Sequence, residues 1–425
     1  MSANSSQPVP EATRAAGLAR LQAFVPHSGR AYATQRNFDR GAGAHSGVSL
    51  LSPYLRHRLL REDEVTTAVL SRYSLSTAEK FIQEVFWRSY FKGWLERRPS
   101  IWQAYRREVD TQIARLDADD SLRGAYDRAV KGETGIGCFD AWAAELIETG
   151  YLHNHARMWF ASIWIFTLDL PWALGADFFL RHLLDGDPAS NTLGWRWVGG
   201  RHTRGKAYAA RASNIAKFTE NRFDPSGQIN ETAIAPDEPA FPAPLPVPES
   251  GHPVAGERTG LLITEDDLHP ESLLPDNLEI VAVATLQATA ERSPLFVAEH
   301  VHAFTHAAIA DAARRNAVKD HAATTIEPGE AGDALVNWAQ GHGITQIVTP
   351  YTPVGPGQEA LDAAEPSLKA AGISLVRQLR PYDQACWPFC TAGFFKVKKA
   401  IPDLIEILAL RPERQPTLPL GASTE

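Results

Sequence analysis

The chain has 425 residues, which is long enough for two domains with separate cores. Its 44% hydrophobic and 22% charged residues are typical of a soluble globular protein and argue against a disordered or fibrous one. The net charge of −8 is unevenly spread: residues 1–230 hold 29 Lys and Arg against 24 Asp and Glu, whereas residues 231–425 hold 13 against 26. The first part could therefore bind a polyanion alone, although two domains of different charge explain the split equally well.

The first part of the chain is predicted to be helical. Residues 1–14 contain no apolar run, so we expect a disordered tail and no signal peptide. From residue 15 to 232 apolar residues recur at helical spacing, and Ser76 followed by Glu79 predicts a capping box that opens a long helix. Residues 158–174 form the one apolar run that resembles a membrane span. Asp169, Pro171 and its short length favour a buried helix, and we expect a cytoplasmic protein without a membrane segment.

The second part has a different pattern. Seven prolines between positions 236 and 253 predict a semi-extended linker over residues 233–257. From residue 258 to 412 short β-rich runs alternate with helical ones, which predicts a Rossmann-like or flavodoxin-like parallel α/β domain, followed by a tail at 413–425. Cys138, Cys386 and Cys390 are too few for a disulfide framework, so we expect buried thiols in a reducing compartment and no metal site.

Three clusters in the helical part have the spacing of a binding site. Glu84, Trp87 and Arg88 share one helix face, as do Asn154, Arg157 and Met158; each set indicates either a pocket wall or ordinary surface and helix-entry residues. In the segment "DGDPASNTLGWRW" the carboxylates of Asp185 and Asp187 could accept hydrogen bonds from ring N–H groups or hydroxyls. Its two indoles fit a core, a stacking platform or an electron path. The basic residues that follow are typical of nucleic-acid binding or of a solvated face: Arg196, Arg201, Arg204, Lys206, Arg211 and Lys217.

Taken together and in this order, six segments resemble the FAD-binding helical domain of the photolyase/cryptochrome family. They are "YATQRNF", "SGVSLLSPYL", "EVFWRSYF", "GETGIGCFDA", "TGYLHNHARM" and "DGDPASNTLGWRW". The segment "RPYDQACWPFCTAGFFKVKKAIP", with the βαβ pattern before it, resembles the α/β domain that normally precedes the FAD domain in this family. The chain therefore resembles the family with its domain order exchanged. The α/β part has no recognisable antenna-binding signature, which argues against a second chromophore.

The resemblance implies a role for individual residues. FAD would be bound by Tyr32, Ser49, Leu51, Ser52, Arg88, Asn154, Arg157, Asp185, Asp187 and Asn191. Val48 stands where the family's phosphate loop has Thr. Asn191 would face flavin N5, where a neutral amide is a poor proton donor and favours the anionic flavin. The substrate would be bound by Arg36, Glu84, Trp87, Asn154, Met158 and Trp197.

The same resemblance implies which residues take part in catalysis: Glu84, Asn191, Trp195 and Trp172. Glu84 would hydrogen-bond the substrate, and the two indoles would be the first members of the family's electron-transfer chain. The third member has no tryptophan at its place near Asp119, so either another residue, Tyr126 or Trp102, is the outer donor or the electron-transfer chain is broken.

The function implied is light-driven repair of cyclobutane pyrimidine dimers in DNA, in which excited reduced FAD passes an electron to the dimer. Asn154 favours these dimers, because the branch that repairs (6-4) lesions has histidine there, while His155 replaces the usual arginine. The partner would be damaged DNA, duplex or single-stranded, and the protein a monomer. Two alternatives are a cryptochrome-type photoreceptor that binds FAD without repair, and a flavoprotein whose α/β domain covers the DNA face.

Overall fold

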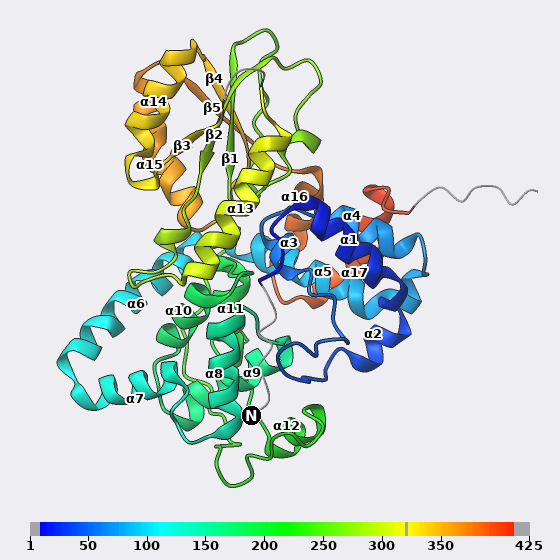
Figure 1. Ribbon diagram of the computed structural model, residues 1–425, viewed down its shortest axis with the longest axis vertical. Coiled ribbons are helices and arrows are strands. Elements are labelled where there is room, and N and C mark those ends of the chain that lie inside the picture. The colour runs from blue at the N-terminus through cyan, green and yellow to red at the C-terminus, as the bar shows by residue number, and fades with distance from the viewer. Residues whose placement is uncertain (1–8, 204, 319–321, 412–425) are drawn as a thin grey trace, which may run out of the picture.

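The computed structural model describes residues 9–203, 205–318 and 322–411 (Figure 1). Arg204 and both chain ends, residues 1–8 and 412–425, lie outside the described residues. The first part is helical, as predicted, and its helices fill the middle and the lower part of Figure 1. Its helices are α1 (Arg14–Phe24), α2 (Arg30–Gln35), α3 (Ser52–Arg56), α4 (Glu62–Leu70), α5 (Leu75–Glu96), α6 (Pro99–Ala118), α7 (Asp120–Lys131), α8 (Gly137–Thr149), α9 (Asn154–Ser162), α10 (Trp172–His182), α11 (Pro188–Val198) and α12 (Ala212–Phe218).

The N-cap of helix α5 lies two residues before the predicted one. Ser74 is its N-cap, and the Ser74 hydroxyl accepts a hydrogen bond from the Thr77 amide at 3.3 Å. Ser76 therefore lies inside the helix, and Glu79 accepts a hydrogen bond from Gln83 one turn later. The prediction of the cap residue was wrong because two serines, at positions 74 and 76, can each start a helix, and the earlier one does.

The apolar run 158–174 forms buried helix, as expected. Helix α9 continues into a π-helical turn, Ile163–Thr167. This helical stretch ends there, and α10 begins at Trp172. Within the described residues no helix is long and apolar enough to cross a membrane. After α12 the chain runs without regular secondary structure to residue 258. It is held against the end of α5, where the Leu245 amide donates to the Arg97 carbonyl at 2.8 Å and Arg97 Nε donates to the Leu245 carbonyl at 2.7 Å.

The second part is a parallel α/β sheet, which confirms the predicted fold class. Its strands are β1 (Thr259–Thr264), β2 (Ile280–Leu286), β3 (Thr324–Ile326), β4 (Gln346–Pro350) and β5 (Ser374–Gln378), in the order β3-β2-β1-β4-β5. All neighbouring pairs are parallel. Helix α13 (Glu299–Arg315) covers one face, and α14 (Ala331–His342) and α15 (Pro356–Ala370) cover the other (Figure 1). The strand order reverses between β1 and β4.

The last two helices return to the helical part. Helices α16 (Pro381–Cys386) and α17 (Phe395–Ile407) both pack against α5 (Figure 1). Glycine permits this close approach, because a Cβ at Gly93 would lie 2.5 Å from Cδ1 of Trp387. The Ser89 hydroxyl also donates to the Tyr382 hydroxyl at 3.0 Å. Helix α5 is therefore held between its own domain and a segment about 300 residues later in the chain. The three cysteines are free and buried, as expected.

Candidate functional site

A cavity of about 550 Å³ opens in the helical part, between α2, the loop before α3, α5, α9 and α11. This volume is typical of a cofactor or ligand site. Every residue that the resemblance assigns to binding FAD or the substrate lines it, and so do three of the four residues that it assigns to catalysis. The lining includes Tyr32, Arg36, Ser49, Leu51, Ser52, Glu84, Trp87, Arg88, Asn154, Arg157, Met158, Asp185, Asp187, Asn191, Trp195 and Trp197. The exception is Trp172, which begins α10 outside the cavity.

Helical spacing explains this convergence. Glu84, Trp87 and Arg88 are one turn apart on α5, and Asn191 and Trp195 are one turn apart on α11, so each helix presents a single face to the cavity. Asp187 caps α11, because its carboxylate accepts the Ser190 amide at 2.7 Å. The cap fixes where the helix begins and thereby which side chains of α11 face inward.

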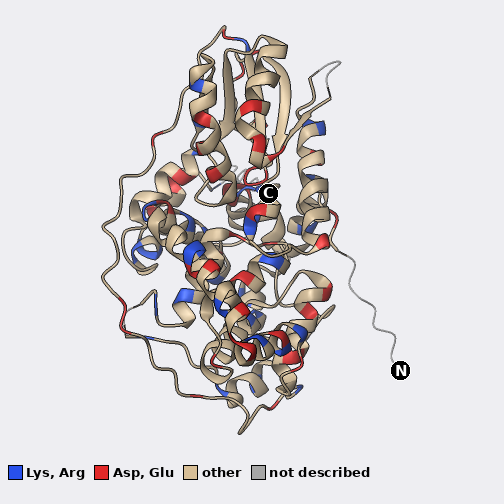
Figure 2. Ribbon diagram, turned by 90° about the vertical axis from the view of Figure 1, so that its left-hand side faces the viewer, with Lys and Arg blue, Asp and Glu red and all other residues tan. Residues whose placement is uncertain are grey.

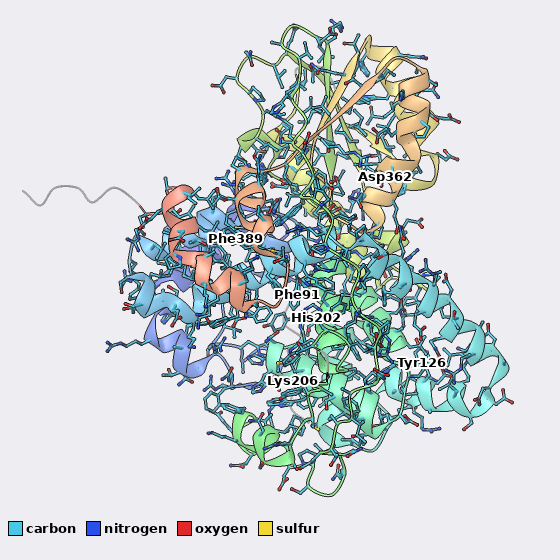
Figure 3. The ribbon with its side chains drawn as sticks, turned by 180° about the vertical axis from the view of Figure 1, so that it is seen from behind. Phe91, Tyr126, His202, Lys206, Asp362 and Phe389 are labelled. Carbon is cyan, nitrogen blue, oxygen red and sulfur yellow. The ribbon has the colours of Figure 1, made fainter. Side chains whose placement is uncertain are left out.

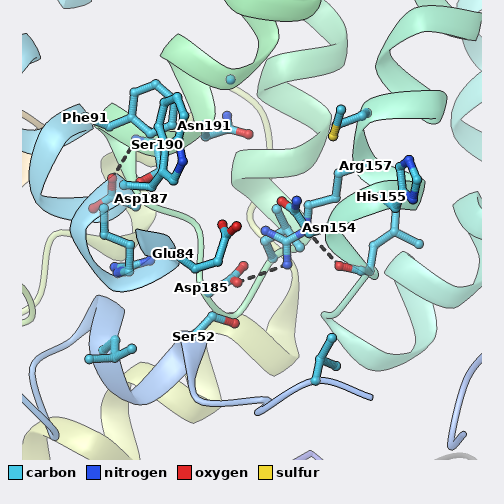
Figure 4. Close-up of a pocket in the computed structure, with 18 of the residues that line it drawn as sticks. Ser52, Glu84, Phe91, Asn154, His155, Arg157, Asp185, Asp187, Ser190 and Asn191 are labelled. Atoms are coloured by element: carbon cyan, nitrogen blue, oxygen red, sulfur yellow. Dashed lines mark hydrogen bonds and ion pairs between the residues drawn. The ribbon is translucent and has the colours of Figure 1, made fainter. Parts of the chain in front are cut away.

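Two carboxylates on the cavity wall are held ionised. Arg157 Nη2 lies 2.9 Å from Asp185 Oδ2, and Figure 4 shows the pair beside Ser52 and Asn154. Burial by itself raises the pKa of Asp185, but the Arg157 guanidinium outweighs it, and the pKa is lower than usual. Burial likewise opposes ionisation of Asp187, yet Lys92, Arg56 and Arg88 together lower its pKa strongly. The wall therefore carries two negative charges surrounded by buried cations.

Several polar atoms on this wall have no protein partner. Among the described residues, nothing hydrogen-bonds to Arg88 Nε and Nη2, Asp185 Oδ1, Ser190 Oγ or Trp195 Nε1, although all of them are buried. A buried polar atom without a hydrogen bond costs about 1–3 kcal/mol. Donors and acceptors left unpaired around one cavity indicate that a polar ligand completes them. That ligand needs acceptors for the guanidinium and a donor for the carboxylate.

The outer side of the cavity is aromatic and has one ion pair. Arg36 and Glu84 pair with each other there, and the Glu84 side chain stays 35% exposed. Burial raises the pKa of Glu84, and Arg36 only partly offsets this. Trp87 stacks on Phe394 with ring centroids 3.9 Å apart. Trp197 stacks on Tyr208 at 5.5 Å. The outer opening of the cavity, which we call the aromatic mouth, thus has one ion pair and two indole rings, each stacked on another aromatic ring.

Comparison with known proteins shows what the helical part of the chain is similar to. Residues 81–232 match the FAD-binding domain of DNA photolyase. The helical part thus contains a region similar to the FAD-binding domain of DNA photolyase. Its FAD-binding domain precedes the α/β part, so the exchanged domain order expected from the sequence is also confirmed.

The alignments cover only part of each matched relative. A deoxyribodipyrimidine photo-lyase from Thermus thermophilus is 34% identical over 56% of this chain and 54% of its own length. One from Synechococcus is 32% identical over 43% of this chain and 37% of its own length. The solved structure of a class III photolyase from Agrobacterium tumefaciens aligns with a TM-score of 0.41 and 26% identity, covering 49% of this chain and 43% of that one. The chain thus spans about half the length, or less, of these relatives.

The FAD-binding domain suits its cofactor chemically. The unpartnered Arg88 nitrogens can donate to phosphate or carbonyl oxygens, and Asp185 Oδ1 can accept from a ring N–H or a hydroxyl. The Asn191 amide is fixed by a 2.7 Å hydrogen bond from Nδ2 to the Ala176 carbonyl. Glycine at position 194 lets the backbone of α11 border the cavity, since a Cβ there would meet no atom within 4 Å.

Two chains of aromatic rings cross the helical part, and one of them starts in the cavity wall. The ring centroid of Trp195, in the wall, lies 6.1 Å from that of Trp164, which in turn lies 6.1 Å from that of Tyr126. In the second chain, the ring centroid of Trp172 lies 5.7 Å from that of Tyr105, which lies 5.3 Å from that of Trp102. Both outer donors considered from the sequence therefore end a chain of rings. The intermediate rings of Trp164 and Tyr105 were missed, because neither belongs to a recognisable motif.

The FAD-binding domain is joined to the α/β part by buried ion pairs. Arg56, the last residue of α3, lies 3.9 Å from Asp187 and 2.6 Å from Asp266 in the loop after β1. Arg58 lies 2.7 Å from Asp383 in α16. Figure 2 shows acidic and basic residues close together in the middle of the molecule, where the sheet meets the helices. The carboxyl edge of the sheet, where open α/β folds usually bind ligands, is thus packed against arginines of the FAD-binding domain.

One buried cluster outside the cavity has metal-ligand spacing. The ligand atoms of Asp39, His45 and Glu145 lie within 4.8 Å of one another. Asp39 Oδ2, however, already accepts hydrogen bonds from Trp142 Nε1 and Arg222 Nη2, each at 2.9 Å. A guanidinium beside the carboxylate opposes a cation, so we assign no metal here.

Proposed function

We propose that the chain binds FAD in the helical cavity and repairs cyclobutane pyrimidine dimers in DNA by light-driven electron transfer. One observation carries this proposal: a wall of unpaired polar groups and an aromatic mouth belong to the same cavity, in a region similar to the FAD-binding domain of DNA photolyase. The bound cofactor supplies the photoexcited electron. The chain's own residues bind, orient and shield the reacting groups.

The inner wall holds the cofactor. Arg88 donates to its oxygens, and the Arg157–Asp185 pair keeps a carboxylate ionised to accept from it. Asn191 offers a neutral amide that has no acidic proton to give. Ser49, in the loop before α3, and Ser52, the first residue of α3, border the same cavity at the start of a helix, where N–H groups favour phosphate.

The outer side receives the dimer. Two adjacent bases turned out of the strand need apolar walls, and Trp87 and Trp197 form two such walls, with Met158 also lining the cavity. Among the described residues that line the cavity, Glu84 is the one carboxyl group with a raised pKa. When protonated it donates a hydrogen bond to a base carbonyl, which requires the dimer to displace Arg36 from it.

Photorepair of a defined oligonucleotide tests the proposal. Reduced, FAD-loaded protein is illuminated with an oligonucleotide that contains one thymine dimer, and the remaining dimer is measured against a dark control. We expect light-dependent loss of dimer, a rate at least tenfold lower for Glu84→Gln, and an unchanged rate for Glu148→Gln, an exposed control outside the cavity. FAD binding without any loss of dimer would reject repair and favour the photoreceptor function.

A further inference from the structure

We propose that the start of α17 is a DNA-binding surface that contacts the strand beside the dimer. The surface consists of residues Phe394–Lys399, which we call the FFKVKK segment. It belongs to the part of the chain beyond the sheet, outside the matched FAD-binding domain. The inference rests on the proposed function, because it takes DNA to enter the cavity.

The FFKVKK segment lies against the cavity wall. The Phe394 ring is stacked on Trp87, with an angle of 15° between the two planes, and meets Tyr90 edge-on at 5.8 Å. Two turns of α5 earlier, Glu79 Oε1 lies 3.5 Å from Lys398 Nζ. The segment therefore runs alongside the part of α5 that carries Trp87 and Glu84. A strand whose dimer rests on Trp87 has its neighbouring nucleotides beside this segment.

Its side chains have the chemistry that a nucleic acid requires. Phe395 is 64% exposed, and the Lys399 amine lies 4.8 Å from its ring. Lys396 and Lys399 are both exposed. Three of the five lysines in residues 231–425 fall within 396–399, although residues 231–425 as a whole are strongly acidic. Exposed rings interleaved with cations bind stacked bases and phosphates together.

A second basic surface flanks the same wall. The ring of Phe91, one turn after Trp87, lies with its centroid 6.1 Å from that of His202, which places His202 next to the aromatic mouth. Lys206, which follows in the chain, is exposed. Figure 3 shows Phe389, Phe91, His202 and Lys206 following one another down the view. Cations thus lie on both sides of the mouth, which fits a strand that crosses it better than an acidic protein that docks on one side.

Charge reversal tests the segment. We would compare Lys396→Glu/Lys399→Glu with Lys369→Glu, an exposed lysine of α15 far from the mouth, and Phe395→Ala with Ile407→Ala, which is 70% exposed at the far end of α17. Binding of a labelled single strand of about 16 nucleotides is followed by fluorescence anisotropy at several salt concentrations. Circular dichroism and FAD content show that each variant is folded and loaded.

We expect the double variant to bind at least tenfold more weakly and to lose about 1.4 from the slope of log K against log salt, about 0.7 for each lost phosphate contact. Phe395→Ala should weaken binding at least fivefold. A dinucleotide dimer does not extend to the segment, so the loss of repair efficiency should be at least tenfold smaller for it than for the oligonucleotide. Both control variants should bind as the unaltered protein does.

Three results would overturn the inference: an unchanged affinity and salt slope, an equal loss with both substrates, or a larger loss of binding to polyglutamate than to DNA. The last would instead indicate docking of an acidic protein. The proposed function fails in a different way, through absence of dimer repair by the unaltered FAD-loaded protein. DNA binding that still depends on Lys396 and Lys399 would then leave the surface established and only the repair activity rejected.

Discussion

Replacing Gly194 with alanine should stabilise the protein without FAD and weaken FAD binding at the same time. Gly194 lies within α11, lines the cavity, and has free space where a Cβ would stand. Glycine in a helix interior costs about 0.5–1 kcal/mol relative to alanine. Because the added methyl group meets no protein atom, the free energy of unfolding without FAD should rise by about that amount.

When FAD is bound, the same substitution should be unfavourable instead of stabilising. A ligand packed against this wall must move away from the new methyl group or overlap with it, and overpacking typically costs about 1–3 kcal/mol. The dissociation constant for FAD should therefore rise about 5- to 150-fold. Urea unfolding of the FAD-free protein gives the first quantity, and a titration followed by flavin fluorescence gives the second.

The control for this experiment is Gly124→Ala in α7. A Cβ there would meet only Arg128 Nη1, at 3.6 Å, and the site is remote from the cavity. It should give the same stabilisation with unchanged FAD affinity. An unchanged FAD affinity in Gly194→Ala would show that the cofactor does not lie against α11. A loss of stability without FAD would show that the space at Gly194 is not free.

Three further predictions concern the same wall. Arg88→Met should reduce FAD affinity more than 100-fold without lowering the free energy of unfolding of the FAD-free protein, since Arg88 has two buried nitrogens without partners. Purification of this variant with full FAD content would contradict the prediction. Asn191→Asp should shift the flavin spectrum after photoreduction toward the neutral form, because a carboxyl group can give a proton that the amide cannot, and an unchanged spectrum would count against a position beside flavin N5. The pKa of Asp187 is lowered, so its ionised carboxylate should stabilise the folded protein fully above about pH 4, and this stabilisation should be lost as the pH falls further. The difference in free energy of unfolding between the unaltered protein and Asp187→Asn, measured with urea, should therefore shrink below about pH 4. A constant difference would exclude this linkage.

The sequence was most informative where function and local spacing coincide. Glu84, Trp87 and Arg88 repeat at helical spacing, so one helix brings all three to the cavity. The change from helical to βαβ patterning likewise marked the sheet, because period and residue type together differ between buried strands and amphipathic helices. A single cap was misplaced at α5 because Ser74 and Ser76 are equivalent by sequence alone.

Contacts between distant segments could not be predicted in this way. Phe394 stacks on Trp87 across about 300 residues, and no periodic pattern relates the two. Arg56 appeared to be one more basic residue, yet it joins Asp187 to Asp266 inside the molecule. Trp172 begins α10 behind Trp195, where a Cβ at Gly175 would lie 2.3 Å from Cη2 of that indole, so it takes no part in the cavity wall. Such arrangements depend on how whole elements pack, which local sequence does not encode.

The central claim is that one cavity holds FAD on its inner wall and a pyrimidine dimer at its mouth. The most direct test is the rate at which the reduced, FAD-loaded protein removes a single thymine dimer from an oligonucleotide under blue light. We predict loss of the dimer that requires light and FAD and that falls at least tenfold in Glu84→Gln. No loss of dimer from fully FAD-loaded protein would contradict the account.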